Sequence, residues 1–377
     1  MSVAPVDGSP RIPASQPVRT PDAIEAGMAP ETSVTFTIPI QVSISLGTPT
    51  LAAGPATARP GVAGPAVGLR EGLFGAPAPP PVADSKFDAD SLLADDFGWK
   101  TALSLALASR LSYAERAVVE STGLNVYGME TCAFFEADDT QCFLATSPGA
   151  VLLAFRGTEQ LADWLANLNV IYTTRPYGTV HRGFLGAFQV VEPQLRIALG
   201  GFRGRKLLLT GHSLGGALAM IAAAEWQGTF PIDRIYTYGQ PAVGRSSYVS
   251  FMESHYDGKI FRFVNDDDVV PQVPPTYRHV GKLIHFDATG NLEGLAGAIT
   301  ERPSPRMVEA APSPADPPML SQAEFDQLRA SLLVQKAAAA SPGRESVGQP
   351  GLEGFFPSVS DHGIDRYIAK IFAQAGG

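Results

Sequence analysis

One stretch, residues 206–226, limits what this chain can fold into more than any other part of the sequence. Three consecutive leucines follow Lys206, and an alanine-rich run without proline follows Gly216. The leucines predict a buried strand, and the alanine-rich run predicts a helix. Between them lies Gly211-His-Ser-Leu-Gly215, a G-x-S-x-G sequence. A strand, a sharp turn and a helix in this order form the context in which such a serine is exposed at the end of a sheet.

The two glycines of this turn flank Ser213, where any Cβ would collide across the tight backbone. The first N–H groups of the helix point toward whatever the serine attacks, and helix N-termini favour negative charge. The pentapeptide also arises by chance, and a serine in this place can simply cap the helix. Assigning Ser213 as a nucleophile therefore requires a base, an acid and oxyanion donors elsewhere in the chain.

Buried strands alternate with helices along the chain on both sides of this turn. Strands are expected at 131–137, 141–147, 150–158, 206–210, 234–238, 259–265 and 282–287, and helices at 97–113, 160–169, 183–199, 216–226, 246–256 and 360–372. A bend or interruption is expected at Pro193. The alternation predicts an α/β protein with a mostly parallel central sheet covered by helices on both faces.

Residues 1–86 differ from the rest because Pro, Ala, Gly, Ser and Thr dominate them. This composition cannot form a core, so a largely disordered extension is expected. Residues 34–46 are the exception, since strict alternation of apolar and polar residues predicts an amphipathic strand. Pro39 excludes a central place in a sheet. We expect this strand to dock on an edge or to self-associate, with membrane or partner binding by strand addition as the alternative.

A second irregular segment, residues 291–350, interrupts the α/β pattern with several proline-containing turns. Within it, Ser321 and Glu324 form a capping box ahead of a predicted helix. Three apolar residues share one face of that helix: Phe325, Leu328 and Leu332. We expect a mobile insertion carrying this amphipathic helix. The catalytic domain then comprises residues 87–290 and 351–377.

Charge and composition exclude several functions. The formal net charge of −9 makes a nucleic-acid partner unfavourable. The sequence lacks the long apolar run of a transmembrane helix, and its first residues lack the basic start and apolar core of an ordinary signal peptide. A cytoplasmic location is the default expectation, and export by another route stays open. Cys132 and Cys142 lie at a similar level of a predicted hairpin, where they either form a disulfide or remain reduced.

The base for Ser213 follows by elimination among the 6 histidines. In sheets of this kind, catalytic groups lie on loops at the carboxyl ends of strands, and the chain order is Ser, then Asp or Glu, then His. The histidines that do not fit are His181 and His212 before the serine, His255 at a helix end, His279 before the last strand and His285 inside it. His362 remains, on a loop that opens the last helix. The alternative is that it only caps that helix.

The acid is expected after a strand that follows the elbow, which is the name used here for the strand, sharp turn and helix around Ser213. The predicted strand at 259–265 is followed directly by three aspartates, Asp266, Asp267 and Asp268. A buried aspartate that accepts the histidine N–H would hold the ring in its working tautomer. We choose Asp268 because Asp-Val-Val-Pro leads straight into a rigid proline turn, with the other two as alternates. An ordinary surface turn is the competing interpretation.

The oxyanion hole requires two backbone donors. One is the N–H of Leu214, which comes with the elbow itself. The other should follow an earlier strand, and Phe155-Arg-Gly-Thr158 occupies that place. Thr158 would offer its N–H to the developing negative charge. An ordinary polar strand end remains the alternative for this residue.

These motifs together resemble the class 3 lipase family of fungal and bacterial triacylglycerol lipases. The matching stretches are, in order, Phe155-Arg-Gly-Thr158, Asp163-Trp164, Val180-His-Arg-Gly-Phe184, Gly211-His-Ser-Leu-Gly-Gly216, Gly239-Gln-Pro-Ala-Val-Gly244, Asp268-Val-Val-Pro271, and Asp361-His362 with Tyr367. The resemblance extends over residues 97–290 and 355–375. It implies an α/β-hydrolase fold, the triad of Ser213, Asp268 and His362, and oxyanion donors at Thr158 and Leu214.

The chain departs from the family pattern in three places. In the family a short lid helix follows the oxyanion strand, whereas residues 160–169 occupy that place here and are only modestly apolar. The insertion at 291–354 and the N-terminal extension lie outside the pattern. These departures leave interfacial activation and substrate size open.

The resemblance implies a serine carboxylic-ester hydrolase that acts through an acyl-Ser213 intermediate, most simply a lipase for acylglycerols. Neither a metal nor an organic cofactor is expected, and no protein partner is indicated. An apolar groove beside Ser213, bordered by the insertion helix as a lid, is expected to bind the acyl chain during transient contact with lipid. The alternatives are a phospholipase A1 or a polar-ester hydrolase with the same triad, and a non-catalytic binding module on a hydrolase scaffold.

Overall fold

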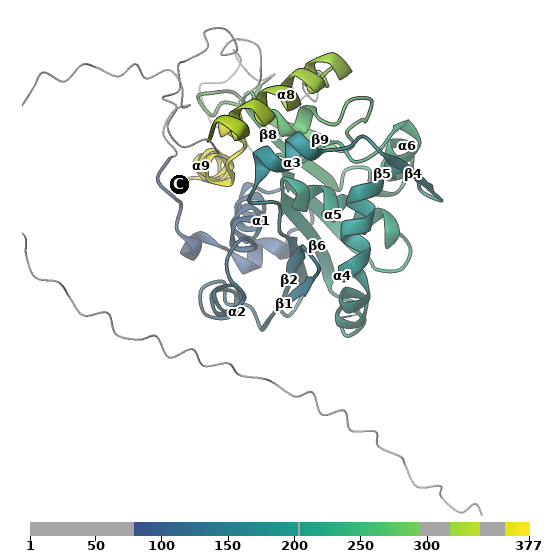
Figure 1. Cartoon of the computed structure of the whole chain (residues 1–377). Helices are drawn as coiled ribbons and strands as arrows, with labels where there is room; N and C mark the ends of the chain where they lie inside the picture. Colours follow the sequence, from purple (N-terminus) through teal and green to yellow (C-terminus); the bar gives the residue numbers. More distant parts are fainter. Residues whose placement is uncertain (1–78, 203, 294–316, 340–358) are drawn as a thin grey trace, which may run out of the picture. The chain divides into compact units, whose positions relative to one another are not determined.

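The computed structural model describes residues 79–202, 204–293, 317–339 and 359–377 (Figure 1). The strand expected at 34–46 lies outside these residues. So does most of the expected insertion, apart from its helix. In the described part, no helix is both long and apolar enough to cross a lipid bilayer.

A seven-stranded sheet forms the centre of the fold, in the order β1-β2-β3-β6-β7-β8-β9. Five neighbouring strands run parallel: β3 (Ala150–Phe155), β6 (Lys206–His212), β7 (Ile232–Tyr238), β8 (Ile260–Asn265) and β9 (Lys282–Phe286). An antiparallel pair, β1 (Thr131–Ala137) and β2 (Thr140–Thr146), extends the sheet beyond β3. The predicted mostly parallel sheet is thus confirmed.

Helices cover both faces of this sheet (Figure 1). On one face α1 (Trp99–Leu111) packs beside α9 (Ile364–Gln374), and on the other α4 (Arg182–Gly200) packs beside α5 (Leu214–Glu225). Further helices are α2 (Arg116–Asn125), α3 (Leu161–Asn167), α6 (Ser246–Tyr256) and α8 (Gln322–Ala339). Short 3-10 turns occupy Asp84–Lys86, Ala89–Leu93, Val270–Gln272 and Ser360–His362.

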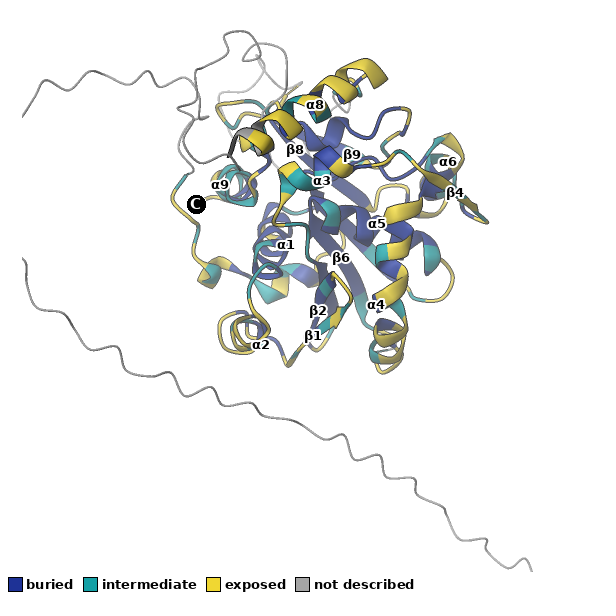
Figure 2. Cartoon of the chain, viewed as in Figure 1, coloured by how far each residue is buried: buried dark blue, intermediate teal, exposed yellow. Residues whose placement is uncertain are grey.

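The elbow strand β6 is buried on both faces, which accounts for its uninterrupted leucines. Leu207 and Leu209 belong to the core under α5, whereas Leu208 belongs to the core under α1. The residues of α5 from Gly215 to Ala224 are all buried, and the glycines and alanines among them let the helix approach the sheet closely. Figure 2 shows the central strands of the sheet in the buried colour, with exposed residues along the outer sides of α4 and α8.

Several elements differ from the sequence-based expectation. Neither α2 nor the hairpin of β4 (Tyr172–Arg175) and β5 (Gly178–His181) was expected, because their short segments carry no clear apolar period. α4 continues through Pro193 without interruption. The terminal helix is divided, because the Ser360–His362 turn ends at Gly363 before α9 begins.

The two cysteines do not pair, so of the two states left open by the sequence the structure has the reduced one. Cys132 lies opposite Ala145 in the β1–β2 register, and Cys142 lies opposite Phe135. Cys142 belongs to the core under α4 and α5, while Cys132 packs against the core on the α1 side. Both are free thiols. The spacing of the two cysteines in the sequence could not show that their side chains point to opposite faces of the sheet, because this depends on where the hairpin turns.

Ordered packing begins before residue 87, where the catalytic domain was expected to start. Asp84 forms an ion pair with Arg110 of α1 at 2.8 Å. The same carboxylate accepts a hydrogen bond from the hydroxyl of Tyr127 at 3.1 Å. The segment that carries Asp84 is therefore fixed to α1, on the face of the sheet that also carries α9.

Strand β1 forms one edge of the sheet, and side chains cap its outward backbone groups. Arg116 donates to the carbonyl of Phe134 at 2.8 Å, and Glu120 accepts the N–H of Phe134 at 3.4 Å. Gln194 donates to the carbonyl of Glu136 at 3.3 Å. These contacts occupy groups that a further strand would use for pairing.

Candidate active site

Ser213 lies at the sharp turn between β6 and α5, as the G-x-S-x-G sequence predicts. Its φ of +58° is rare for a residue with a side chain and marks local strain. The flanking glycines are sterically required. A Cβ on Gly211 would collide with the backbone of Gly215, and one on Gly215 would collide with the carbonyl of Phe155. The turn therefore depends on both glycines to hold the serine at the carboxyl end of the sheet.

Asp268 and His362 meet beyond the ends of β7 and β8 although they are 94 residues apart in the sequence. Nδ1 of His362 lies 2.8 Å from Oδ2 of Asp268 and 3.1 Å from Oδ1. A carboxylate only accepts, so Nδ1 carries the proton and Nε2 keeps its lone pair. Asp268 is 1% exposed and His362 is 3% exposed. The pair is thus buried, and its free ring nitrogen has the electronic form of a general base.

Three further contacts hold this pair. Tyr367 of α9 donates to Oδ2 of Asp268 at 2.5 Å, and the N–H of Val270 donates to Oδ1 at 2.9 Å. The side-chain amide of Asn265 donates to the carbonyl of Asp361 at 2.7 Å, which fixes the turn before His362. A buried carboxylate is stable only with such donors around it.

The two aspartates beside Asp268 lie in different surroundings. Asp266 has a φ of +48° and its carbonyl accepts from Nε2 of His285 at 2.9 Å. Burial, together with the charges of Asp361 and Asp267, raises the pKa of Asp266. Asp267 is exposed. Of the three, Asp268 is the carboxylate that the fold brings to His362.

The contact between Ser213 and His362 is not closed in this structure. The hydroxyl oxygen of Ser213 and Nε2 of His362 are both buried, and neither has a hydrogen-bond partner among the described residues. The ring of His362 nevertheless lies 4.4 Å, between centroids, from the ring of His212, which precedes the serine. Asp268 and His362 are thus joined, whereas no hydrogen bond joins Ser213 to His362 in this structure.

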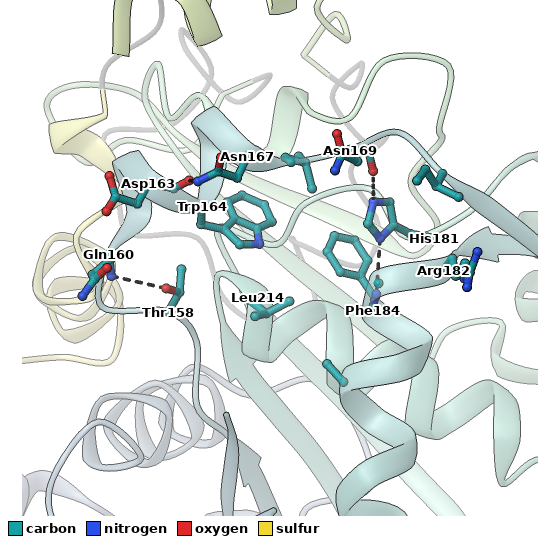
Figure 3. Close-up of a pocket in the computed structure, with 14 residues that line it drawn as sticks. Thr158, Gln160, Asp163, Trp164, Asn167, Asn169, His181, Arg182, Phe184 and Leu214 are labelled. Carbon is teal, nitrogen blue, oxygen red and sulfur yellow. Dashed lines mark hydrogen bonds between the residues drawn. The ribbon is translucent and has the colours of Figure 1, made fainter. Parts of the chain in front are cut away.

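The two predicted oxyanion donors line the same cavity. α5 begins at Leu214, so the N–H of this residue is among the first donors of the helix, which have no partner within it. Thr158 follows β3, and its hydroxyl accepts the N–H of Gln160 at 3.3 Å. Both residues face the cavity shown in Figure 3.

This cavity has a volume of about 710 Å³ and lies between α3 and the start of α4. One part of its lining is apolar: Trp164, Leu168, Ile171, Phe184, Ala187 and Leu214. Another part is polar: Gln160, Asp163, Asn167, Asn169, His181 and Arg182. Figure 3 shows Trp164 pointing from α3 into the space above Leu214. The cavity is therefore large enough for one acyl chain and has polar groups at its rim.

The insertion helix α8 does not border this cavity, contrary to expectation, because it packs on the outer side of α3. The predicted face is buried there: Phe325, Leu328 and Leu332 are 0%, 3% and 8% exposed. Arg329 donates to the carbonyl of Ala166 in α3 at 3.0 Å. α3 thus lies between the cavity and α8, and α8 fixes it from outside.

His181, excluded as the base, supports the cavity wall. Its Nε2 donates to the carbonyl of Asn169 at 2.7 Å, and its Nδ1 accepts the N–H of Phe184 at 3.3 Å as the cap of α4. Burial lowers the pKa of His181. This arrangement needs the neutral ring, since a protonated Nδ1 cannot accept the N–H of Phe184.

Sequence reasoning missed one part of the site, the contacts of Tyr113 and His212. His212 was set aside because it precedes the serine, and Tyr113 carries no motif. Each ring nitrogen of His212 is nevertheless engaged, by Tyr113 and by the backbone of His362. Within the described residues, no group of three His, Cys, Asp or Glu side chains is arranged to hold a metal ion.

Comparison with known proteins agrees with the residue pattern. A model of the family described as Lipase (class 3) matches residues 152–278. A secreted mono- and diacylglycerol lipase of Fusarium solani is 35% identical over 148 residues, which is 36% of this chain and 44% of that protein. A lipase of Rhizomucor miehei is 33% identical over 162 residues, 38% of this chain and 44% of that protein.

A chloroplastic phospholipase A(1) of Arabidopsis thaliana is also similar. It is 31% identical over 150 residues, covering 33% of each chain. The matched part of this chain therefore spans less than half the length of each of these three relatives.

Proposed function

We propose that this chain, which belongs to the class 3 lipase family through residues 152–278, hydrolyses carboxylic esters of lipids. Ser213 is the nucleophile, His362 the general base and acid, and Asp268 the residue that orients His362. The observation that carries the proposal is the buried Asp268–His362 pair, 2.8 Å apart, beside a serine held at a φ of +58°.

The geometry suits acyl transfer in two steps. Nε2 of His362 takes the proton of Ser213 as its oxygen attacks the ester carbonyl, and the N–H groups of Leu214 and Thr158 bind the oxyanion. His362 then protonates the leaving alcohol, which leaves an acyl-Ser213 ester. Water, activated by the same imidazole, releases the acid. Each oxyanion donor contributes about 3 kcal/mol in the transition state.

Acylglycerols are the substrates that the cavity supports best. Trp164, Phe184 and Leu214 offer an apolar wall for one acyl chain, next to both oxyanion residues. The polar rim, which includes Asn167 and Asn169, suits the hydroxyl groups of a glycerol more than a second buried chain. The name of the Fusarium solani relative includes mono- and diacylglycerol, in agreement with this size.

Access to Ser213 requires movement of α3. The serine is 1% exposed, and α3 lies over the cavity that contains the oxyanion residues. Because α8 packs on α3, the two helices move as one lid unit, formed by residues 161–167 and 322–339. Contact with a lipid surface would favour the open position by covering the apolar side that α3 exposes on leaving.

A phospholipase A1 is the second candidate, favoured by the similarity to the Arabidopsis thaliana protein. The same triad would cleave an ester of a glycerophospholipid, with Arg182 at the cavity rim available to the phosphate.

The name of the Fusarium solani relative also includes the word secreted, which favours release from the cell over a cytoplasmic location. Comparing activity in medium and cell extract would test this.

One assay panel tests the function. Purified chain is given mono-, di- and triacylglycerol emulsions, phosphatidylcholine vesicles and soluble esters of rising chain length. We expect acylglycerol hydrolysis, its loss in Ser213→Ala, and labelling of Ser213 by a fluorophosphonate. Preference for phosphatidylcholine would select the phospholipase, and preference for small aromatic esters would select a polar-ester hydrolase. A folded chain that stays unlabelled and inactive would overturn the enzymatic function.

A further inference from the structure

His212, the second residue of the G-x-S-x-G sequence, is fully engaged in the interior. It is 5% exposed. Its Nε2 lies 2.6 Å from the backbone carbonyl of His362, 150 residues away. Its Nδ1 lies 2.9 Å from the hydroxyl of Tyr113, which follows α1 and is 99 residues away. One imidazole thus connects the ends of α1 and β6 with the turn before α9.

The direction of both hydrogen bonds follows from the carbonyl. A carbonyl oxygen only accepts, so Nε2 of His212 must carry the proton. Nδ1 is then an acceptor, and the hydroxyl of Tyr113 donates to it. Burial, with the neighbouring His362, lowers the pKa of His212 well below its usual range. Burial also raises the pKa of Tyr113, so its hydroxyl keeps the proton that it donates.

Tyr113 also contacts the segment that carries the oxyanion residue Thr158. The backbone of Gly157 lies against the Tyr113 hydroxyl. The approach is close, because a Cβ on Gly157 would collide with that hydroxyl and would lie 2.6 Å from the carbonyl of His212. The guanidinium of Arg156 lies 5.7 Å from the centre of the Tyr113 ring. Only a glycine at 157 allows this contact.

We propose that Tyr113 and His212 are positioning residues that align the oxyanion segment and the His362 turn on opposite sides of Ser213. The link starts at the close contact of Gly157 with the Tyr113 hydroxyl. It continues through the hydrogen bond from Tyr113 to His212 and the one from His212 to the carbonyl of His362. The inference rests on the proposed function, since it assigns these residues a role in that reaction.

The link complements the contacts already described at His362. Asp268 fixes the imidazole of His362 through Nδ1, whereas His212 fixes its backbone. Both are needed to aim Nε2 at the serine, because a displacement near 1 Å costs about 100-fold in rate. His212 must also stay neutral, since His362 becomes cationic during turnover only 4.4 Å away between ring centroids. The hydrogen bond from Tyr113 to Nδ1 selects the neutral tautomer of His212. This tautomer donates from Nε2 to the carbonyl of His362 and places no charge beside the ring of His362.

The test is Tyr113→Phe, which keeps the ring and removes the hydroxyl. We expect kcat on a soluble ester to fall about 10-fold, the effect of one hydrogen bond of about 1.4 kcal/mol, with KM unchanged. Rates are expressed per active site counted by fluorophosphonate titration, so unfolded protein does not contribute. Tyr256→Phe is the matched control, because it removes a buried hydroxyl that donates to the carbonyl of Ala223 away from the site.

A double-mutant cycle adds a second readout. If the hydroxyl acts through His212, Tyr113→Phe costs nothing further in a His212→Ala background, whereas independent packing effects would add. Wild-type kcat per titrated site in Tyr113→Phe, or full additivity in the cycle, overturns the positioning role. Wild-type protein without ester hydrolysis would instead overturn the proposed function, so the two failures are distinguishable.

Discussion

The hydroxyl of Tyr367 lies 2.5 Å from Oδ2 of Asp268, the same oxygen that accepts from His362 at 2.8 Å. Tyr367 is on the second turn of α9, which packs against α1. The terminal helix therefore contributes a donor to the carboxylate as well as apolar contacts to the core. With the N–H of Val270 on the other oxygen, both oxygens of a fully buried charge are satisfied.

Replacing Tyr367 by phenylalanine tests this donor. Tyr367→Phe should lower kcat about 10-fold with little change in KM, since the carboxylate loses one of its orienting hydrogen bonds. The measurement is steady-state hydrolysis of a soluble ester, normalised to titrated sites. Tyr177→Phe serves as control, because its hydroxyl donates to Glu225 in another part of the fold. Equal losses in the two variants would contradict a role at Asp268.

Gly239, directly after β7, is a position where a single added methyl group should strongly reduce activity. Its φ is +57°, and a Cβ there would lie 2.8 Å from Oδ2 of Asp268 and from Nδ1 of His362. Gly239→Ala should therefore separate the pair and reduce kcat by about 100-fold or more. Gly228→Ala is the matched control, with a φ of +75° and no atom near the added Cβ. It should reduce thermal stability through backbone strain and leave kcat unchanged.

Stability should decline as the pH falls below about 6.5, partly because of His181. Burial lowers the pKa of His181 in the folded state, so the unfolded chain binds the proton more readily. The stabilisation is complete above the unfolded pKa and is lost as the pH falls toward the folded one. His181→Asn should show a smaller drop in Tm between pH 7.5 and 5.5 than wild type. An identical drop in Tm for the two proteins would show that His181 does not contribute to it. The carboxylates, which also titrate in acid, are the same in both proteins and cancel in the comparison.

The packing of α8 on α3 predicts a variant with easier access to the site. Phe325→Ala removes a ring that is 0% exposed and weakens the docking by about 3 kcal/mol. Activity on soluble short-chain esters should then rise relative to activity on emulsions. Leu333→Ala, on the exposed side of the same helix, should keep the wild-type ratio. Deleting residues 300–345 should act in the same direction, and an unchanged ratio in both would rule out the lid unit.

Much of this site could be predicted because its chemistry is ordered along the chain. The elbow is a local feature, so seven consecutive residues of strand and a glycine-flanked serine place Ser213. His362 followed from its position after the last strand, and Asp268 from the proline turn behind it. These inferences used local patterns together with the order of strands and catalytic residues along the chain, and both can be read without knowing contacts between distant segments.

The parts that could not be predicted depend on contacts between distant segments. Tyr113 and His212 meet across 99 residues without a motif in either segment. The outward packing of α8 could not be read from its apolar face, since such a face fits either α3 or the cavity mouth. Cys132 and Cys142 differ in the face of the sheet to which they point, which a spacing of ten cannot reveal without the β1–β2 register.

The capped edge of β1 bears on how this protein behaves at high concentration. A strand from a second molecule that approached this border would first have to displace Arg116, Glu120 and Gln194 from the backbone. Two of these side chains are charged, and burying them without partners is costly. Growth of fibrillar aggregates from this edge of the sheet is thereby disfavoured. Aggregation during concentration or storage should therefore begin elsewhere on the molecule.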